Sequence, residues 1–332
     1  MIQKRNHKKK LPKKTTFLLL LGVILAGFVI YSATRTAADL EGPKTDGMVS
    51  SLGFYQSLLP LSSREAKVPI IGAKAALVAY IDSQGNQKFI FEKNKDLNLP
   101  IASISKLMTA LIVLEEYDLD EKIIVSKEAS MRDISRLNNL YVGEEYRVRD
   151  LLYPLLMESS NSAAYALAER SRFLPAEGQS PDRVSFFVGR MNQKANSLGM
   201  KNTYFINPSG LDSSAVNYST AADLIILAEY LLDKELIWEI LSLPQFNLIR
   251  TDGYSKHTVV NTNMLLGKMA GIMGGKTGTT SRAGQCFLSV IKRSEGEYLI
   301  SVVLGSEDRF NETKKILDWA ESAHYLKLMN IR

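Results

Sequence analysis

The sequence contains very few of the side chains that bind metal ions or form disulfides. Its 332 residues include one cysteine, Cys286, and three histidines, His7, His257 and His324, none of which form a paired motif. Zinc sites use cysteine and histidine ligands at short, regular spacings, so we expect no metal site. With one cysteine no internal disulfide can form, and the folded part of the chain must be stabilised by its core.

Motifs typical of other hydrolases and of nucleotide-binding proteins are missing as well. The sequence has no Gly-x-Ser-x-Gly nucleophile motif and no glycine-rich phosphate-binding loop. The segment Asn207-Pro208-Ser209-Gly210 has the composition of a turn. If the chain is a hydrolase, the remaining possibility is a serine nucleophile activated by a lysine, because that arrangement needs no histidine.

Positive charge is concentrated at the N-terminus. The first 14 residues include no acid and seven basic residues, which are Lys4, Arg5, Lys8, Lys9, Lys10, Lys13 and Lys14. Without these seven charges the formal net charge falls from +6 to −1. The basic character therefore belongs to the tail and does not indicate a nucleic-acid partner.

An apolar stretch follows the basic tail. Residues 15–34 carry no charge, and as a helix these 20 residues would span about 30 Å, the thickness of the hydrocarbon core of a membrane. The stretch is either a retained anchor in the cytoplasmic membrane or a signal peptide cleaved near Thr36-Ala37-Ala38, and its length favours the anchor. In both cases the rest of the chain lies outside the cytoplasm. We predict an N-terminal segment (1–38), a linker (39–67) and a globular domain (68–332).

The pattern of the globular domain predicts strands at both ends and helices between them. We expect a hairpin of strands at residues 75–81 and 88–91, and two further strands at residues 285–292 and 298–305. Helices are expected at residues 103–116, 149–157 and 162–170, from a cap at Ser219 and Thr220 to residue 232, and from about residue 309. This order predicts an α+β fold with one sheet closed by both ends of the domain.

Ser103 and Lys106 are the first candidate site residues. They lie three residues apart at the start of a predicted helix, and therefore on one face of it. Burial and a second cation such as Lys276 would lower the pKa of the lysine, so that its amine could act as a base near neutral pH. The backbone N–H of Ser103 is a candidate oxyanion donor. A second Ser-x-x-Lys match, Ser289 and Lys292, lies in a predicted strand, where the two side chains point to opposite faces, and we discard it.

Ser159 and Asn161 form the second motif, in a break between two predicted helices. A loop at this point could present a hydroxyl that carries protons and an amide that holds the backbone of a substrate. Serine and asparagine are also common helix N-caps, and this second interpretation is favoured when the motif is considered alone. The two roles are compatible.

Lys276-Thr277-Gly278-Thr279 is the most specific of the three motifs. A strand edge with a lysine, a hydroxyl and a glycine suits an extended substrate laid beside it, since glycine allows a close approach of backbones. The N–H of Thr279 would complete an oxyanion hole with that of Ser103. A plain strand after the Gly274-Gly275 pair would explain the glycines but not the lysine and the hydroxyl together.

With these motifs the chain resembles the low-molecular-mass penicillin-binding proteins of the serine D-alanyl-D-alanine carboxypeptidase family. The resemblance covers residues 68–325 and extends to the segments 101–109, 205–212 and 309–315. It implies a serine β-lactamase/penicillin-binding-protein-like transpeptidase fold, with an antiparallel sheet and a helical subdomain. It also implies peptidoglycan stem peptides as substrates, β-lactam antibiotics as covalent inhibitors, and no metal or organic cofactor.

The resemblance also implies a role for each site residue. Ser103 would be the acylated nucleophile and Lys106 its base. Ser159 and Lys276 would relay protons, and Asn161 would hold the substrate amide. Thr277 and Arg309 would bind the terminal carboxylate of the substrate, beside Gly278 and Thr279 at the strand edge.

Two departures from the family pattern stand out. Ser160 occupies a position that is often glycine, and the additional C-terminal β-domain and anchor of many members are absent from this sequence, which favours anchoring by residues 15–34.

Three other functions are alternatives to a carboxypeptidase. A D,D-endopeptidase that cleaves cross-links would use the same site. A β-lactamase would need a glutamate for deacylation, and Glu169 and Glu177 lack a convincing setting. A non-catalytic cell-wall-binding protein is disfavoured because every expected catalytic residue is present.

Overall fold

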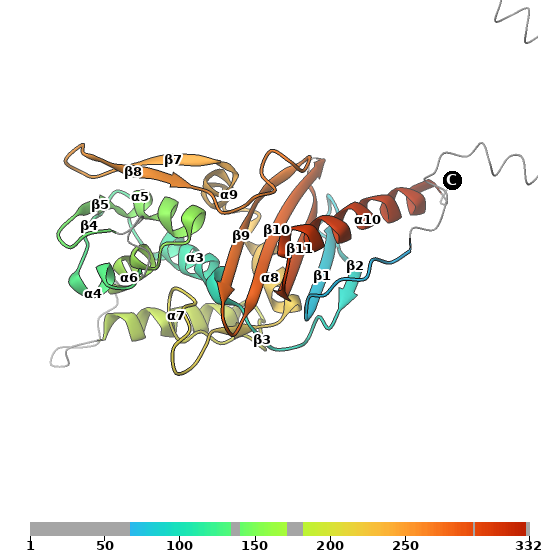
Figure 1. The fold of residues 1–332 in the computed structure, drawn as a ribbon, viewed down its shortest axis with the longest axis horizontal. Helices are drawn as coiled ribbons and strands as arrows, with labels where there is room; N and C mark the ends of the chain where they lie inside the picture. The colour runs from blue at the N-terminus through green and yellow to red at the C-terminus, as the bar shows by residue number, and fades with distance from the viewer. Residues whose placement is uncertain (1–66, 134–139, 171–181, 295, 330–332) are drawn as a thin grey trace, which may run out of the picture. The chain divides into compact units, whose positions relative to one another are not determined.

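The central element of the structure is an antiparallel sheet. The computed structural model describes residues 67–133, 140–170, 182–294 and 296–329. The strand order is β2 (Gln87–Lys93), β1 (Ala75–Ile81), β11 (Glu297–Ser306), β10 (Gly284–Ser294) and β9 (Ile272–Thr280). Pairing of β1 with β11 closes the sheet from both ends of the domain, as the sequence predicts, and leaves β9 at one edge (Figure 1).

Helices cover both faces of this sheet. Successive side chains of its strands point to opposite faces, and both sets of side chains are apolar. Ala76 and Val78 of β1 belong to a core cluster with Ile316 and Leu317 of α10 (Arg309–Met329), which covers one face. Leu77, with its neighbours Ala75 and Ala79, belongs to the larger core cluster on the opposite face. A strand with apolar residues on both faces is buried between two layers, which explains why 75–81 shows no polar alternation.

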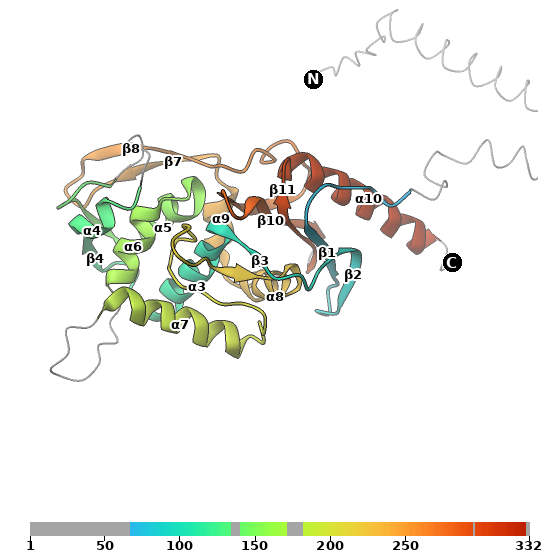
Figure 2. The same ribbon diagram turned by 60° about the horizontal axis from the view of Figure 1, so that its bottom comes forward.

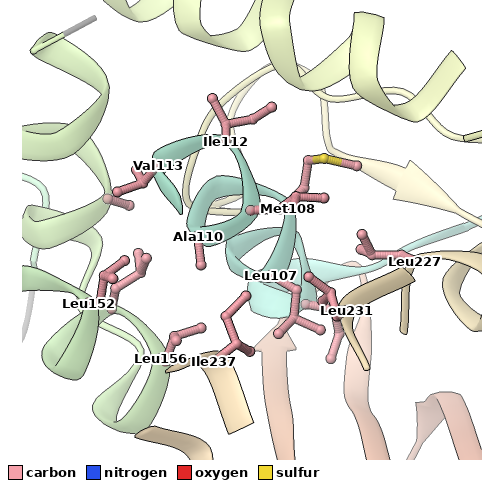
Figure 3. Close-up of a cluster of buried hydrophobic side chains, with 14 of the residues drawn as sticks. Leu107, Met108, Ala110, Ile112, Val113, Leu152, Leu156, Leu227, Leu231 and Ile237 are labelled. Carbon is pink, nitrogen blue, oxygen red and sulfur yellow. The ribbon is translucent and has the colours of Figure 1, made fainter. Parts of the chain in front are cut away.

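The larger core is built around α3 (Lys106–Glu116), whose first eight residues are all buried. Figure 3 shows Leu107 and Met108 of this helix among side chains of α5 (Val148–Tyr153), the π-helix η3 (Pro154–Glu158), α8 (Ala221–Leu231) and α9 (Glu235–Ser242). A helix that is apolar all round is stable only when it is enclosed in this way. The burial of α3 fixes the position of its N-terminus, where Ser103 and Lys106 lie.

The remaining elements lie around this helical region. They are β3 (Leu99–Pro100) paired with β6 (Tyr218–Ser219), β4 (Lys122–Ile124) paired with β5 (Glu145–Arg147), α4 (Lys127–Ser130), α6 (Asn161–Glu169), α7 (Arg183–Ser197), and the hairpin of β7 (Gln245–Ile249) and β8 (Ser255–Val260). The hairpin and α7 lie on opposite sides of the helical region (Figures 1 and 2). Helices α7 and α9 and this hairpin are not among the elements expected from the sequence.

Three predicted helices have different boundaries in the structure. The helix expected at 103–116 begins as a 3₁₀ turn, η2 (Ala102–Ser105), and becomes α-helical at Lys106. The helix expected at 149–157 changes to a π-helix at Pro154, a residue that cannot donate the usual backbone hydrogen bond. Thr220 alone caps α8, by accepting a hydrogen bond from the N–H of Asp223, while Ser219 belongs to β6.

The predicted membrane segment and most of the predicted linker lie outside the described residues. Within the described part of the chain, every helix is too short or too polar to cross a bilayer.

Candidate active site

Ser103 lies in the 3₁₀ turn that joins β3 to α3. The preceding residue, Ala102, has a φ of 47°, a left-handed conformation that is unfavourable for a residue with a side chain. The turn is held by Ser105, whose hydroxyl donates to the Ala102 carbonyl (2.8 Å) and accepts from the amide of Asn217 (2.9 Å). A Cβ at Gly210 would lie 1.9 Å from the Ala102 oxygen, so only glycine fits there. The packing therefore determines the position of Ser103.

Lys106 is completely buried, and its amine has three acceptors. Nζ lies 2.9 Å from Ser103 Oγ, 2.8 Å from Asn161 Oδ1 and 2.6 Å from the carbonyl oxygen of Ser209. Burial lowers the pKa of Lys106 to about 7. A neutral amine has two hydrogens and one lone pair, so it can donate to the amide and the carbonyl while the lone pair accepts the Ser103 proton. This arrangement joins the first and second motifs around one base.

The second motif lies between η3 and α6. Ser159 ends the π-helix with a φ of 68°, and its buried Oγ has no hydrogen-bond partner among the described residues. The N-cap of α6 is Ser160, which accepts from the N–H of Ala163 (3.1 Å). The capping interpretation is therefore correct for the segment but assigns the cap to the wrong residue. Because Ser160 serves as the cap, the Ser159 hydroxyl and the Asn161 amide are not used for capping.

Asp133, which was not among the residues expected from the sequence, stabilises the start of α6. Its carboxylate accepts hydrogen bonds from Ser160 Oγ (2.8 Å), Asn161 N (3.0 Å) and Ser162 N (2.9 Å). A carboxylate is favourable at a helix N-terminus, and here it also fixes the residue that bonds Lys106. The negative charge of Asp133 raises the pKa of Lys106 and so offsets part of the lowering that burial causes. Ser160, the departure from the common glycine, thus has a structural partner.

Replacing Asp133 with alanine is expected to weaken both the fold and the site. Loss of three accepted hydrogen bonds should destabilise the protein by about 1–3 kcal/mol. Removal of a charge that raises the pKa of Lys106 should also shift the acid limb of the pH–rate profile to lower pH. Asp182→Ala is the matched control, because that exposed carboxylate caps α7 in the same way, away from Lys106. If the pH–rate profiles of Asp133→Ala and Asp182→Ala were identical, the effect of the Asp133 charge on the pKa of Lys106 would be contradicted.

The third motif lies on the edge strand β9. Lys276 is buried, and its Nζ donates to the Thr277 carbonyl (2.9 Å). Burial lowers the pKa of Lys276 well below the usual value, and the neighbouring charges of Lys106 and Arg309 lower it further. For Lys106 itself, burial lowers the pKa, as expected from the sequence, but the charge that acts on it is that of Asp133 and not the expected second cation. The structure shows no hydrogen bond between Ser159 and Lys276, since the Ser159 hydroxyl has no partner in the part of the chain that the structure describes.

The end of the motif lies against Ser103. A Cβ on Gly278 would lie 3.0 Å from the Ser103 nitrogen, so the glycine permits β9 to approach Ser103. Arg309 Nη1 donates to the Gly278 carbonyl (2.7 Å) and to Thr279 Oγ1 (2.6 Å), which places its guanidinium at this strand edge. The hydroxyl of Thr277 lies 2.6 Å from that of Thr262. The three motifs, 173 residues apart from Ser103 to Lys276, therefore meet at one place.

Residues considered for other chemistry lie in different settings. Glu169 accepts a hydrogen bond from Ser126 Oγ (2.6 Å) beside α4, and Glu177 lies outside the described residues. Ser289 is buried in β10 and hydrogen-bonded to Ser301 (2.7 Å), as expected of a structural serine. Across the described ranges, no cluster of histidine, cysteine and carboxylate side chains could hold a metal ion.

Comparison with known protein families and sequences agrees with this geometry. A family model described as D-alanyl-D-alanine carboxypeptidase, peptidase family S11, matches residues 62–308. A D-alanyl-D-alanine endopeptidase of Pseudomonas aeruginosa is 32% identical over 264 residues, which cover 78% of this chain and 81% of that protein. The D-alanyl-D-alanine carboxypeptidase DacF of Bacillus subtilis is 32% identical over 260 residues, which cover 76% of this chain and 64% of DacF.

Solved structures give the same result. Penicillin-binding protein D2 of Listeria monocytogenes, in its cefotaxime-bound form, has a TM-score of 0.64 and 33% identity, with 76% of this chain and 98% of that chain covered. A mutant of the DD-transpeptidase of Streptomyces K15 has a TM-score of 0.68 and 29% identity, with 76% and 99% covered. The protein thus has the fold of penicillin-binding proteins. It belongs to the D-alanyl-D-alanine carboxypeptidase family of serine peptidases, which confirms the resemblance found in the sequence.

Proposed function

We propose that this chain is a serine D,D-carboxypeptidase that removes the terminal D-alanine from peptidoglycan stem pentapeptides through an acyl-enzyme on Ser103. The observation that carries the proposal is the buried contact of Lys106 Nζ with Ser103 Oγ, because a lysine with a pKa of about 7 is a base at neutral pH. Asn161 and the Ser209 carbonyl orient the amine toward the nucleophile.

The reaction follows from these positions. Neutral Lys106 takes the proton of Ser103, whose oxygen attacks the carbonyl carbon of the penultimate D-alanine. The N–H groups of Ser103 and Thr279 stabilise the oxyanion. Ser159 and Lys276 relay this proton from Lys106 to the amine of the departing D-alanine as the peptide bond breaks, which leaves Lys106 neutral again. Lys106 then takes a proton from the water that attacks the ester, and it returns this proton to Ser103 as the bond from Ser103 Oγ to the acyl carbon breaks.

The terminal carboxylate would be recognised at the edge of β9. Thr277 and Arg309 carry the hydroxyl and the cation for this contact, beside Gly278. A guanidinium and a hydroxyl are suited to a carboxylate, which only accepts hydrogen bonds. This contact would select substrates that end in a free carboxylate.

A D,D-endopeptidase that cleaves cross-links is the second candidate, since two relatives with that name are each 32% identical to this chain. A β-lactamase is disfavoured, because Glu169 is bonded to Ser126 rather than to the nucleophile turn.

The test uses two substrates for the purified chain. The first is a stem pentapeptide ending in D-alanyl-D-alanine, and the second is a cross-linked dimer of stem peptides without a terminal D-alanine. We expect D-alanine release from the first to exceed cleavage of the second. Faster cleavage of the dimer would assign the endopeptidase activity instead, and cleavage of neither by a folded chain would contradict both.

β-Lactam antibiotics are expected to acylate the same serine, as family membership and the ligand-bound relatives suggest. Penicillin-binding protein D2 is known in cefotaxime-bound and ampicillin-bound forms.

We place the catalytic domain at residues 68–332, outside the cytoplasm, with residues 15–34 as a single membrane anchor and residues 39–67 as the linker. The support is the charge-free run beside seven basic residues; a secreted form cleaved near residue 38 is the alternative.

A further inference from the structure

Thr262 lies outside the three motifs, but it forms hydrogen bonds with Thr277 of the third motif and with Met157, close to the second. It lies between β8 and β9 and is exposed to solvent. Its backbone nitrogen and its Oγ1 each lie 3.0 Å from the carbonyl oxygen of Met157, two residues before Ser159. The same Oγ1 lies 2.6 Å from Oγ1 of Thr277. The Thr262 hydroxyl is therefore a hydrogen-bond partner of the Thr277 hydroxyl.

The hydrogen atoms at this contact allow two arrangements, since each hydroxyl has one hydrogen. In the first, Thr262 donates to the Met157 carbonyl and Thr277 donates to Thr262. Thr277 then presents only lone pairs to the strand edge. In the second, Thr262 donates to Thr277, and the proton of Thr277 is directed to a ligand. The Met157 carbonyl keeps a hydrogen bond in both, because the Thr262 N–H also donates to it.

A carboxylate accepts hydrogen bonds and donates none, so only the second arrangement suits a substrate carboxylate. In that arrangement Thr277 accepts one hydrogen bond while it donates another, and such chains strengthen each bond. The 2.6 Å contact also fixes the position of the Thr277 oxygen, whose residue is only 4% exposed.

We propose that Thr262 is a positioning residue that directs the Thr277 hydroxyl to the free carboxylate of the ligand, and so contributes to the selection of substrates with a free C-terminus. This inference rests on the proposed function for the role of Thr277. It adds a residue outside the three motifs, joined to the second motif through Met157 and to the third through Thr277.

The test compares ligands that differ only in the carboxylate. Acylation of the full chain by benzylpenicillin and by its methyl ester is followed by intact mass for the wild type, Thr262→Val and Thr262→Ser. In Thr262→Val the ratio of the two acylation rates is expected to fall by about tenfold, the effect of one lost hydrogen bond. In Thr262→Ser, which keeps the hydroxyl, the ratio should stay near the wild-type value.

Parallel assays use a D-alanyl-D-alanine peptide and its C-terminal amide. Here Thr262→Val should raise KM for the acid more than it lowers kcat. In Thr277→Val, addition of Thr262→Val should change the ratio little further, because the hydroxyl that it orients is already absent. Equal losses for both ligands, an unchanged ratio, or additive effects in the double variant would overturn the role of Thr262. A folded wild-type chain that is acylated by penicillin but cleaves no peptide would overturn the proposed function alone.

Discussion

Ser103→Ala should release no D-alanine from a stem pentapeptide and form no adduct with penicillin. The loss is expected to be roughly 10³-fold or more in kcat, because the substitution removes the atom that forms the ester and leaves only binding and oxyanion contacts. The substitution should leave the fold intact, since within the described residues the Ser103 side chain is hydrogen-bonded to Lys106 alone. Release of D-alanine is measured over time, together with the melting temperature.

Ser289→Ala is the matched control for this variant. Ser289 is also followed by a lysine three positions later, but its hydroxyl is buried in β10 against Ser301. We expect this variant to lose some stability and to keep its activity. Residual turnover by Ser103→Ala at more than a few per cent of the wild-type rate, or an inactive but folded Ser289→Ala, would contradict the assignment of the nucleophile.

The acylation rate should rise with pH through about 7, the pKa of Lys106. The direction follows from the role of the amine, because only its neutral form can take the Ser103 proton. Below that pH the neutral fraction falls about tenfold per unit, so the rate should fall with it. The measurement is the second-order rate of acylation by benzylpenicillin between pH 5.5 and 8.5.

Lys106→Met tests whether the rise of the acylation rate near pH 7 comes from the titration of Lys106. Methionine replaces a fully buried lysine with an uncharged side chain of similar length, and the variant should lose roughly 10²-fold or more in acylation rate, the contribution of a general base. Lys95→Met, at a partly exposed position where the lysine pairs with Glu92, should keep both the rate and its pH dependence. A wild-type rate that is constant across pH 7, or that falls as the pH rises, would contradict the account of Lys106.

Local patterns were sufficient to predict most of the sheet. The continuous apolar runs of β1, β10 and β11 and the spacing of the β1–β2 turn predicted their positions closely. The hairpin β7–β8 was missed although its signal was present: Asp252-Gly253 lies between two alternating segments, a common hairpin turn. Helix α7 was missed because it contains many polar residues, although Asp182 before it is a typical N-cap.

The residues of the candidate site could be proposed from the sequence, but their contacts could not. Local spacing brings Ser103 and Lys106 together, and no pattern shows that Asp133 bonds Asn161 from 28 residues away or that the Ser209 carbonyl accepts from Lys106. These contacts depend on how distant segments pack. Asn207-Pro208-Ser209-Gly210 was expected to be a turn and lies outside the helices and strands, but composition alone does not show that the Ser209 carbonyl oxygen contacts Lys106.

The most direct test of the central claim is the mass of the intact chain after incubation with benzylpenicillin, followed by peptide mapping. The account predicts a long-lived adduct of one penicillin per chain, located on the peptide that contains Ser103 and absent from Ser103→Ala. A folded chain that forms no adduct, or one that is modified at another residue, would contradict it.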